Sequence, residues 1–78
     1  MVLHVKKEVA VYLGEQKYYQ GYISEQDLGE VIEMNFMTWS LEGFARWYIA
    51  FAEHAKVIEP LEIKMRVKKM INQILENI

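Results

Sequence analysis

Apolar residues recur at helical spacing in the second half of the chain. From Ser40 onward they are separated by three or four residues, so they share one face of a helix. Ser40 is suited to cap this helix, and Glu42 places a negative charge in its first turn. A second stripe follows Pro60, which fits a helix start because its missing N–H would have no partner there. The two stripes are Leu41, Phe44, Ala45, Tyr48, Phe51 and Ala52, and then Ile63, Val67, Met70, Ile71, Ile74 and Ile78.

The pattern between and before these helices favours strands. Ala55 to Glu59 is a short apolar segment of strand length, bounded by polar residues. Tyr19 to Glu25 and Val31 to Trp39 are two further predicted strands, and the turn signal from Gln26 to Gly29 joins them into a β-hairpin. In the second hairpin strand, one side is predicted to carry Ile32, Met34, Phe36 and Thr38, and the other side Glu33, Asn35 and Met37.

The first thirteen residues leave two interpretations open. Val2 to Val5 suits a first strand. From Lys6 to Leu13, apolar and polar residues alternate as in a half-buried strand. Val5, Val9, Tyr12 and Leu13 also share one helical face, and Gly14 would then stop that helix. On pattern alone we predict a strand. The element order predicts an α+β domain whose antiparallel sheet packs on helices.

Length and composition narrow the class of protein. The chain has 78 residues, enough for one domain, and 53% of them are hydrophobic, which leaves apolar surface for an interface. It has no cysteine, so disulfides and thiolate chemistry are excluded. No apolar run approaches the roughly 20 residues of a membrane span, and no charged leader precedes an apolar signal core. We therefore expect a soluble cytoplasmic protein with no membrane partner.

Charge is unevenly distributed along the chain. The net charge of −2 argues against the uniformly basic surface of a dedicated nucleic-acid binder. Positions 14 to 62 carry three cations against nine carboxylates, whereas the two ends carry six cations against two carboxylates. We interpret the basic end as a solvated C-terminal helix whose lysines face water. An anionic partner at that end is the alternative.

The polar residues do not form a recognisable catalytic or metal-binding pattern. His4 and His54 are far apart in sequence, and neither has a second ligand at metal spacing, so we expect no metal and no cofactor. The acidic residues around the hairpin turn lack the cleft that acid–base catalysis requires. No nucleophile elbow or glycine-rich phosphate loop is present, so we do not expect an enzyme. Glu62 and Arg66 are spaced for a helical ion pair.

Aromatic residues beside cations mark the candidate contact surfaces. Tyr18, Tyr19 and Tyr22 cluster next to Lys17, in a composition that suits a core or subunit interface and also suits base stacking. Trp47 lies just off the main apolar stripe, beside Arg46, a combination common in interface anchors. The predicted interface or ligand-facing residues are Lys17, Tyr18, Tyr19, Arg46 and Trp47.

The segment from Gly43 to Pro60 resembles the C-terminal extension domain of the bacterial WYL-domain transcriptional regulators. In that family a helix containing Arg-Trp precedes a strand of the form Val-x-Val-Leu-x-Pro and a closing helix. Arg46, Trp47 and Pro60 match this pattern, and Tyr18-Tyr19-Gln20 stands where the family has a Trp-His-Pro-Ser-Gln run. The likeness extends over nearly the whole chain, and Asp27-Leu28-Gly29 resembles the family's Asp-Gly hairpin turn.

The resemblance implies a fold and a set of partners. It implies a ferredoxin-like βαββαβ domain with an added C-terminal helix, in which Lys6 to Leu13 is helical. It also implies that residues 1–78 are one domain, the C-terminal fragment of a larger regulator. A WYL domain and a helix-turn-helix domain of that regulator would be its partners, with DNA bound through the N-terminal domain. The implied role is homodimerisation and coupling of effector binding to DNA binding. A module that itself binds single-stranded nucleic acid or a nucleotide is the alternative.

Overall fold

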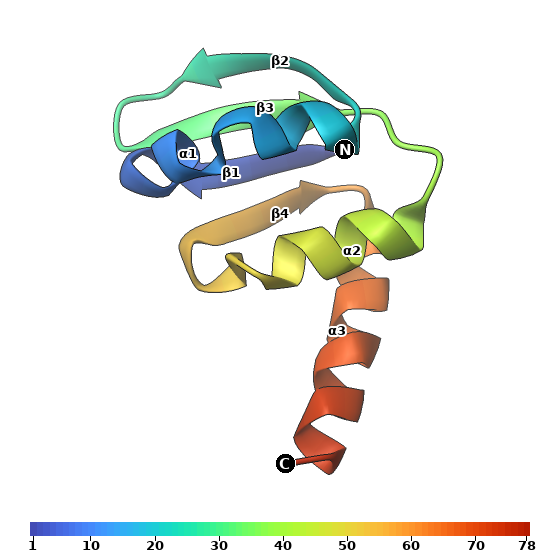
Figure 1. Ribbon diagram of the computed structural model, residues 1–78. Coiled ribbons are helices and arrows are strands. Elements are labelled where there is room, and N and C mark those ends of the chain that lie inside the picture. Colours follow the sequence, from blue (N-terminus) through green and yellow to red (C-terminus); the bar gives the residue numbers. More distant parts are fainter.

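Four strands form one antiparallel sheet in the computed structural model of residues 1–78 (Figure 1). They pair in the order β2-β3-β1-β4, and every pair of neighbours is antiparallel. This is the ferredoxin-like strand order that the resemblance implied. The strands are β1 (Val2–Lys6), β2 (Tyr22–Asp27), β3 (Val31–Phe36) and β4 (Ala55–Glu59).

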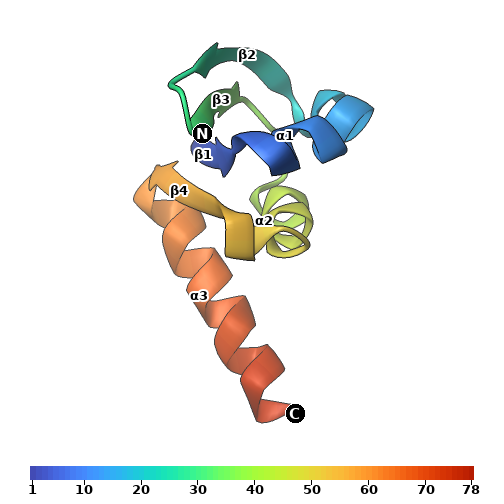
Figure 2. The ribbon, with the colours of Figure 1, turned by 90° about the vertical axis from the view of Figure 1, so that its left-hand side faces the viewer.

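Two helices, α1 and α2, cover one face of the sheet, and a third helix leaves it (Figure 2). The third helix, α3, starts beside β4 and runs away from the rest of the molecule, which gives overall dimensions of 36 × 25 × 21 Å. The α-helices are α1 (Lys7–Leu13), α2 (Leu41–Ile49) and α3 (Leu61–Glu76), and the 3-10 helices are η1 (Gly14–Gln20) and η2 (Ala52–His54). The fold is thus α+β with an additional C-terminal helix, as predicted.

The strand predicted over Lys6 to Leu13 is wrong. The strand β1 ends at Lys6, and residues 7–13 form α1, as the resemblance implied. Alternation would have buried Val11 together with Leu13, but the Val11 side chain is 78% exposed while Leu13 is buried. Val9 and Ala10 pack against the core with Leu13, which is the spacing of a helical face.

Two predicted strand boundaries also change. Residues 19–20 belong to η1, so β2 begins only at Tyr22, after Gly21. The strand predicted up to Trp39 ends at Phe36, and Trp39 is fully exposed. The turn predicted from Gln26 to Gly29 is present, with the Gly29 backbone N–H donating to Asp27 Oδ1 at 2.8 Å.

The core consists of 14 buried residues, all of them apolar. It fills the layer between the sheet and the helices, and its largest fully buried side chains are Phe36 and Phe44. Ile32, Met34 and Phe36, predicted to share one side of their strand, are all buried. Four residues of the first predicted helical stripe are also buried, namely Phe44, Ala45, Tyr48 and Phe51.

The second predicted stripe is only half covered. Ile63, Val67 and Met70 are buried against the body of the domain. Ile71 and Ile74 are 40% and 44% exposed, and Ile78 is 94% exposed. The amphipathic pattern of α3 therefore continues past the part of the helix that the domain itself can cover.

Candidate functional site

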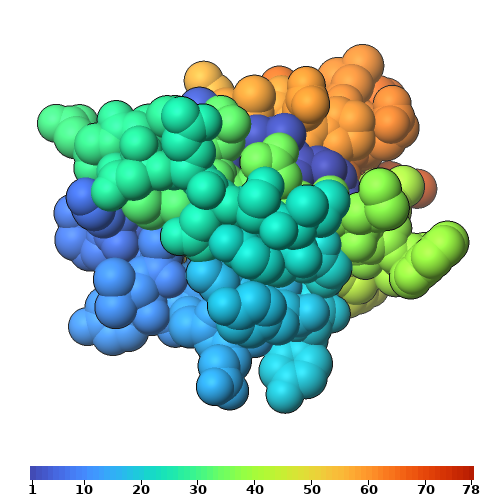
Figure 3. Space-filling view, turned by 90° about the horizontal axis from the view of Figure 1, so that it is seen from above, coloured from blue at the N-terminus to red at the C-terminus, as the bar shows by residue number.

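The first candidate surface is formed by η1 and β2. Figure 3 shows these two segments adjoining on one face of the molecule, with side chains of η1 protruding at its edge. Tyr18 and Tyr19 in η1 are 62% and 84% exposed. Tyr12 in α1 is 82% exposed as well. These tyrosines are therefore available for contacts outside the domain.

Lys17 is not a free cation on this surface. Its Nζ lies 2.6 Å from Glu25 Oε1 and 4.6 Å from the centre of the Tyr22 ring. Tyr18 packs edge-on against Tyr22, with ring centres 5.3 Å apart. The hydrogen bond between Lys17 and Glu25 raises the pKa of Lys17 and lowers the pKa of Glu25. Both partners are thus held in their charged forms and neutralise each other.

Trp47 connects this surface to α2. Its indole Nε1 donates to Gln16 Oε1 at 3.3 Å, which links α2 to η1. The indole ring packs edge-on against Phe36, Phe44 and Phe51, at centroid distances of 5.6, 5.8 and 4.7 Å. Trp47 is half-buried, so most of its contacts are with the core of its own domain.

Arg46 lies on a different side of α2. Its Nη2 is 2.9 Å from Glu42 Oε2, and Arg66 of α3 donates through Nε to Glu42 Oε1 at 2.6 Å. The predicted helical pair between Glu62 and Arg66 is wrong, because Arg66 binds Glu42 across the helix interface instead. These contacts lower the pKa of Glu42, chiefly through the hydrogen bond from Arg66.

The five predicted site residues therefore belong to two surfaces rather than one. Lys17, Tyr18 and Trp47 are connected through the η1 segment, and Tyr19 is the exposed neighbour of Tyr18. Arg46 instead borders a hollow with Met70, Gln73, Ile74 and Asn77 on α3. Sequence reasoning missed Gln16 and Glu25 as partners of these residues, because both contacts depend on the position of η1.

The second candidate surface is the distal part of α3. Four of the fifteen large apolar side chains that remain exposed in the molecule belong to its last turns. Ile71 and Ile74 are three residues apart on one side of the helix, and Ile78 follows just beyond its end at Glu76. The four side chains are Ile71, Ile74, Leu75 and Ile78, and we call them the distal stripe.

Histidine and carboxylate side chains do not form a metal-binding cluster in this structure. His4 Nε2 lies 2.8 Å from Glu33 Oε2 on the outward face of the sheet. No group of three histidine, aspartate or glutamate side chains is arranged to hold a metal ion. None of the helices is both long enough and apolar enough to cross a membrane.

Comparison with known protein families gives a match over nearly the whole chain. The family described as the WCX domain matches residues 1–75. The chain belongs to the WCX domain family. A WCX domain is the C-terminal domain found in WYL-domain regulators, so the resemblance carried by the segment from Gly43 to Pro60 is confirmed. Neither a search of curated proteins nor a search of solved structures gave a match.

Membership of the WCX family gives the surfaces described above a context. The WCX domain implies an association with WYL-type regulators. Exposed apolar side chains on such a domain are candidates for contacts with another domain or another copy. The distal stripe and the exposed tyrosines are two of the places where this structure offers them.

Proposed function

We propose that this WCX domain is the regulatory C-terminal module of a WYL-type DNA-binding transcriptional regulator. In this role it supports assembly of a homodimer and couples effector binding in the regulator to a change in DNA-binding geometry. DNA would be bound by a separate helix-turn-helix domain, and the WYL domain would be the partner within the regulator. The family match and the distal stripe support this proposal.

The distal stripe is the observation that carries the assembly role. Burying exposed apolar side chains against a partner stabilises the complex by about 25 cal/mol for each Å² of apolar surface removed from water. Their spacing along α3 suits contact with an equivalent helix of a second copy. A symmetric pair of such helices buries the stripe of each copy with one contact.

The test is the mass of the chain by light scattering over a concentration series from about 1 μM to several hundred μM. We expect a dimer whose fraction rises with concentration, as mass action requires for a reversible association. A monomer at every concentration would contradict the homodimer role. A docking role against the WYL domain would then account for the same surface.

A second function, binding of single-stranded nucleic acid, is favoured by the exposed tyrosines of α1 and η1. Such side chains can stack on bases. The outward face of the sheet offers no comparable stacking surface. Its residues are polar or aliphatic, for example His4, Glu33 and Lys56. Steeply salt-dependent binding of short oligonucleotides, lost in a Tyr18→Ala/Tyr19→Ala variant, would support this function. Absence of binding at low salt would exclude it.

A further inference from the structure

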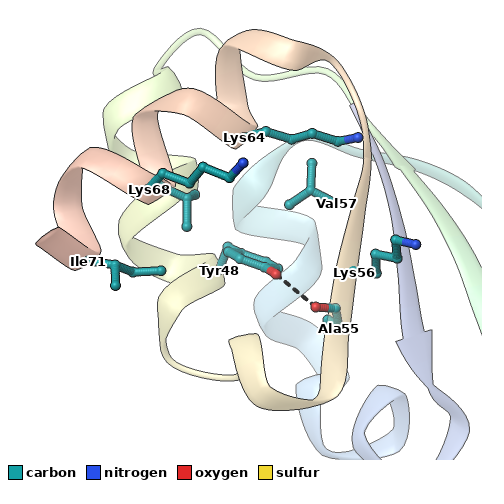
Figure 4. A pocket seen from close by; sticks show the side chains of 8 residues that line it. Tyr48, Ala55, Lys56, Val57, Lys64, Lys68 and Ile71 are labelled. Atoms are coloured by element: carbon teal, nitrogen blue, oxygen red, sulfur yellow. Dashed lines mark hydrogen bonds between the residues drawn. The ribbon is translucent and has the colours of Figure 1, made fainter.

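A hollow of about 370 Å³ lies between β4, α2 and α3 (Figure 4). Its floor is apolar and its rim is cationic. Eight residues line it, and five of them are hydrophobic. The floor is formed by Tyr48, Ala55, Val57, Val67 and Ile71, and the rim by Lys64 and Lys68. Lys56 also borders the hollow from β4, but its side chain points to the outward face of the sheet (Figure 4).

The three lysines have no partners in the domain. None of them forms an ion pair, whereas the two lysines near the hairpin, Lys7 and Lys17, are each bound to a carboxylate. No acidic side chain lines the hollow. Lys64 and Lys68 therefore place two positive charges at its rim without compensation.

Two of these lysines are arranged in a way that costs the free domain stability. Lys64 and Lys68 are four residues apart on α3, so like charges face each other on the helix surface and repel. Figure 4 shows both side chains extending from α3 toward β4, above Tyr48 and Val57. Lys64 is half-buried, so its methylene groups cover part of the apolar floor while its ammonium group stays at the rim. An anion placed between them would relieve the repulsion.

The apolar floor of the hollow requires a ligand with an apolar part. Tyr48 is buried, and its hydroxyl group already donates to the Ala55 carbonyl oxygen at 2.7 Å, so it offers no free donor to a polar ligand. The remaining floor residues are aliphatic. A volume of about 370 Å³ is at the small end of the usual range for ligand sites, which suits one small molecule.

The other hollows in the molecule lack this combination. The largest, about 490 Å³, is lined by Lys6, Lys7, Glu8 and Glu30 with one apolar residue, so its charges balance. Another, of about 340 Å³, combines His4, Lys6, His54 and Lys56 with Glu53 and has only two apolar residues. Apolar floor and uncompensated positive rim occur together only between β4 and α3.

We infer that this hollow is a binding site for a small anionic amphiphile, with an aliphatic or aromatic body on the apolar floor and a carboxylate between Lys64 and Lys68. The site is separate from the dimerisation role, because it uses the lysine face of α3. Only Ile71 belongs both to the hollow and to the distal stripe.

The experiment is an amide ¹H–¹⁵N NMR titration of the 78-residue chain with octanoate as the probe. We expect shifts confined to β4 and to residues 64–71, with a dissociation constant of about 0.1–1 mM, as suits a ligand of this size. The neutral analogue 1-octanol tests the charge, and inorganic phosphate tests the apolar body. Each should bind at least about fivefold more weakly than octanoate.

Matched variants test the residues. Lys64→Gln/Lys68→Gln should weaken octanoate binding by about tenfold, because two partly exposed ion pairs are lost. Lys69→Gln removes one exposed lysine from the same helix outside the hollow and should leave binding unchanged. Equal affinity for octanoate and 1-octanol would overturn the proposal. Unchanged binding by the double variant would also overturn it, as would shifts that follow residues 74–78 instead of the hollow.

Discussion

The junction of η1 and β2 depends on the backbone conformation of Gly21. Its φ is +82°, and a Cβ atom added there would lie 1.8 Å from the Met37 carbonyl oxygen. In the structure the Met37 backbone N–H donates to the Gly21 carbonyl oxygen at 2.8 Å, which ties η1 to the chain beyond β3. Only glycine permits both this conformation and this close approach.

The substitution Gly21→Ala should therefore destabilise the domain by about 3 kcal/mol or more, from a strained backbone together with a steric clash. The measurement is urea denaturation followed by tryptophan fluorescence. Gly29→Ala is the control, because Gly29 also has positive φ, at +104°, but has open space around its Cβ position. It should cost about 1–2 kcal/mol. Equal losses in the two variants would show that the contact with Met37 is unimportant.

Trp47 and Arg46 are neighbours in sequence with separate roles in the structure. Trp47→Ala removes three aromatic contacts and should lower the free energy of unfolding by about 2–4 kcal/mol. Arg46→Ala removes an exposed ion pair with Glu42 and should lower it by less than about 1 kcal/mol. Denaturation curves of the two single variants separate these effects. A Trp47→Ala variant as stable as the parent would make Trp47 an interface residue only.

At the scale of elements, the ion pairs around Glu42 join α2 to α3. The pKa of Glu42 is lowered because Arg66 donates a hydrogen bond to the carboxylate, so the folded state favours the charged form. The resulting stabilisation is present above the usual glutamate pKa of 4.5. It is lost as the pH falls through the lower pKa of the folded state.

We expect Glu42→Gln to lower the urea midpoint at pH 7 and to flatten the dependence of stability on pH below 4.5. The measurement is the urea midpoint at a series of pH values. Glu62→Gln is a suitable control, because Glu62 lies in the first turn of α3 and forms no ion pair. If the stability of Glu42→Gln fell with decreasing pH as steeply as that of the parent, the ion pair between Glu42 and Arg66 would not have the role assigned to it.

The elements predicted correctly from the sequence are those in which buried residues recur at a single spacing, either that of a strand or that of a helix. The strand β3 alternates between buried and half-exposed positions, and α2 buries one helical stripe, so periodicity identified both. Residues 7–13 fit both periods, so periodicity alone could not distinguish the helix that the structure shows from a strand. The segment η1 has no apolar period at all, since none of its residues is buried.

The candidate site was predicted less completely than the fold. The aromatic residues at 18, 19 and 47 stood out by type, but the partner that neutralises Lys17 is eight residues away on a strand, and Trp47 meets Gln16 across 31 positions. Such contacts follow from how α2 and η1 sit on the sheet. From the sequence, Lys64 and Lys68 could be recognised only as part of a basic C-terminal segment. The hollow that they border depends on the position of α3 beside β4.

At the scale of the whole molecule, the distal stripe makes association separable from folding. Ile74→Ser/Ile78→Ser removes two exposed apolar side chains and should weaken a dimer by at least about tenfold, while the unfolding midpoint at concentrations where the chain is monomeric changes little. Light scattering and thermal unfolding of the same samples check both parts. Lys69→Ser, an exposed position outside the stripe, should leave the mass unchanged. Unaltered association in the double variant would place the interface elsewhere.

The attachment of α3 also has a mechanical consequence. The helix is held along its first part by Ile63, Val67 and Met70, and its last six residues, beyond Met70, extend for about 9 Å. A rigid rod anchored at one end converts rotation at its base into translation at its tip. A tilt of about 10° at the anchor, which lies beside the lysine-rimmed hollow, moves the end of α3 by about 1.5 Å. A small rotation of the packed part of α3 is therefore converted into a displacement of the exposed isoleucines at its end.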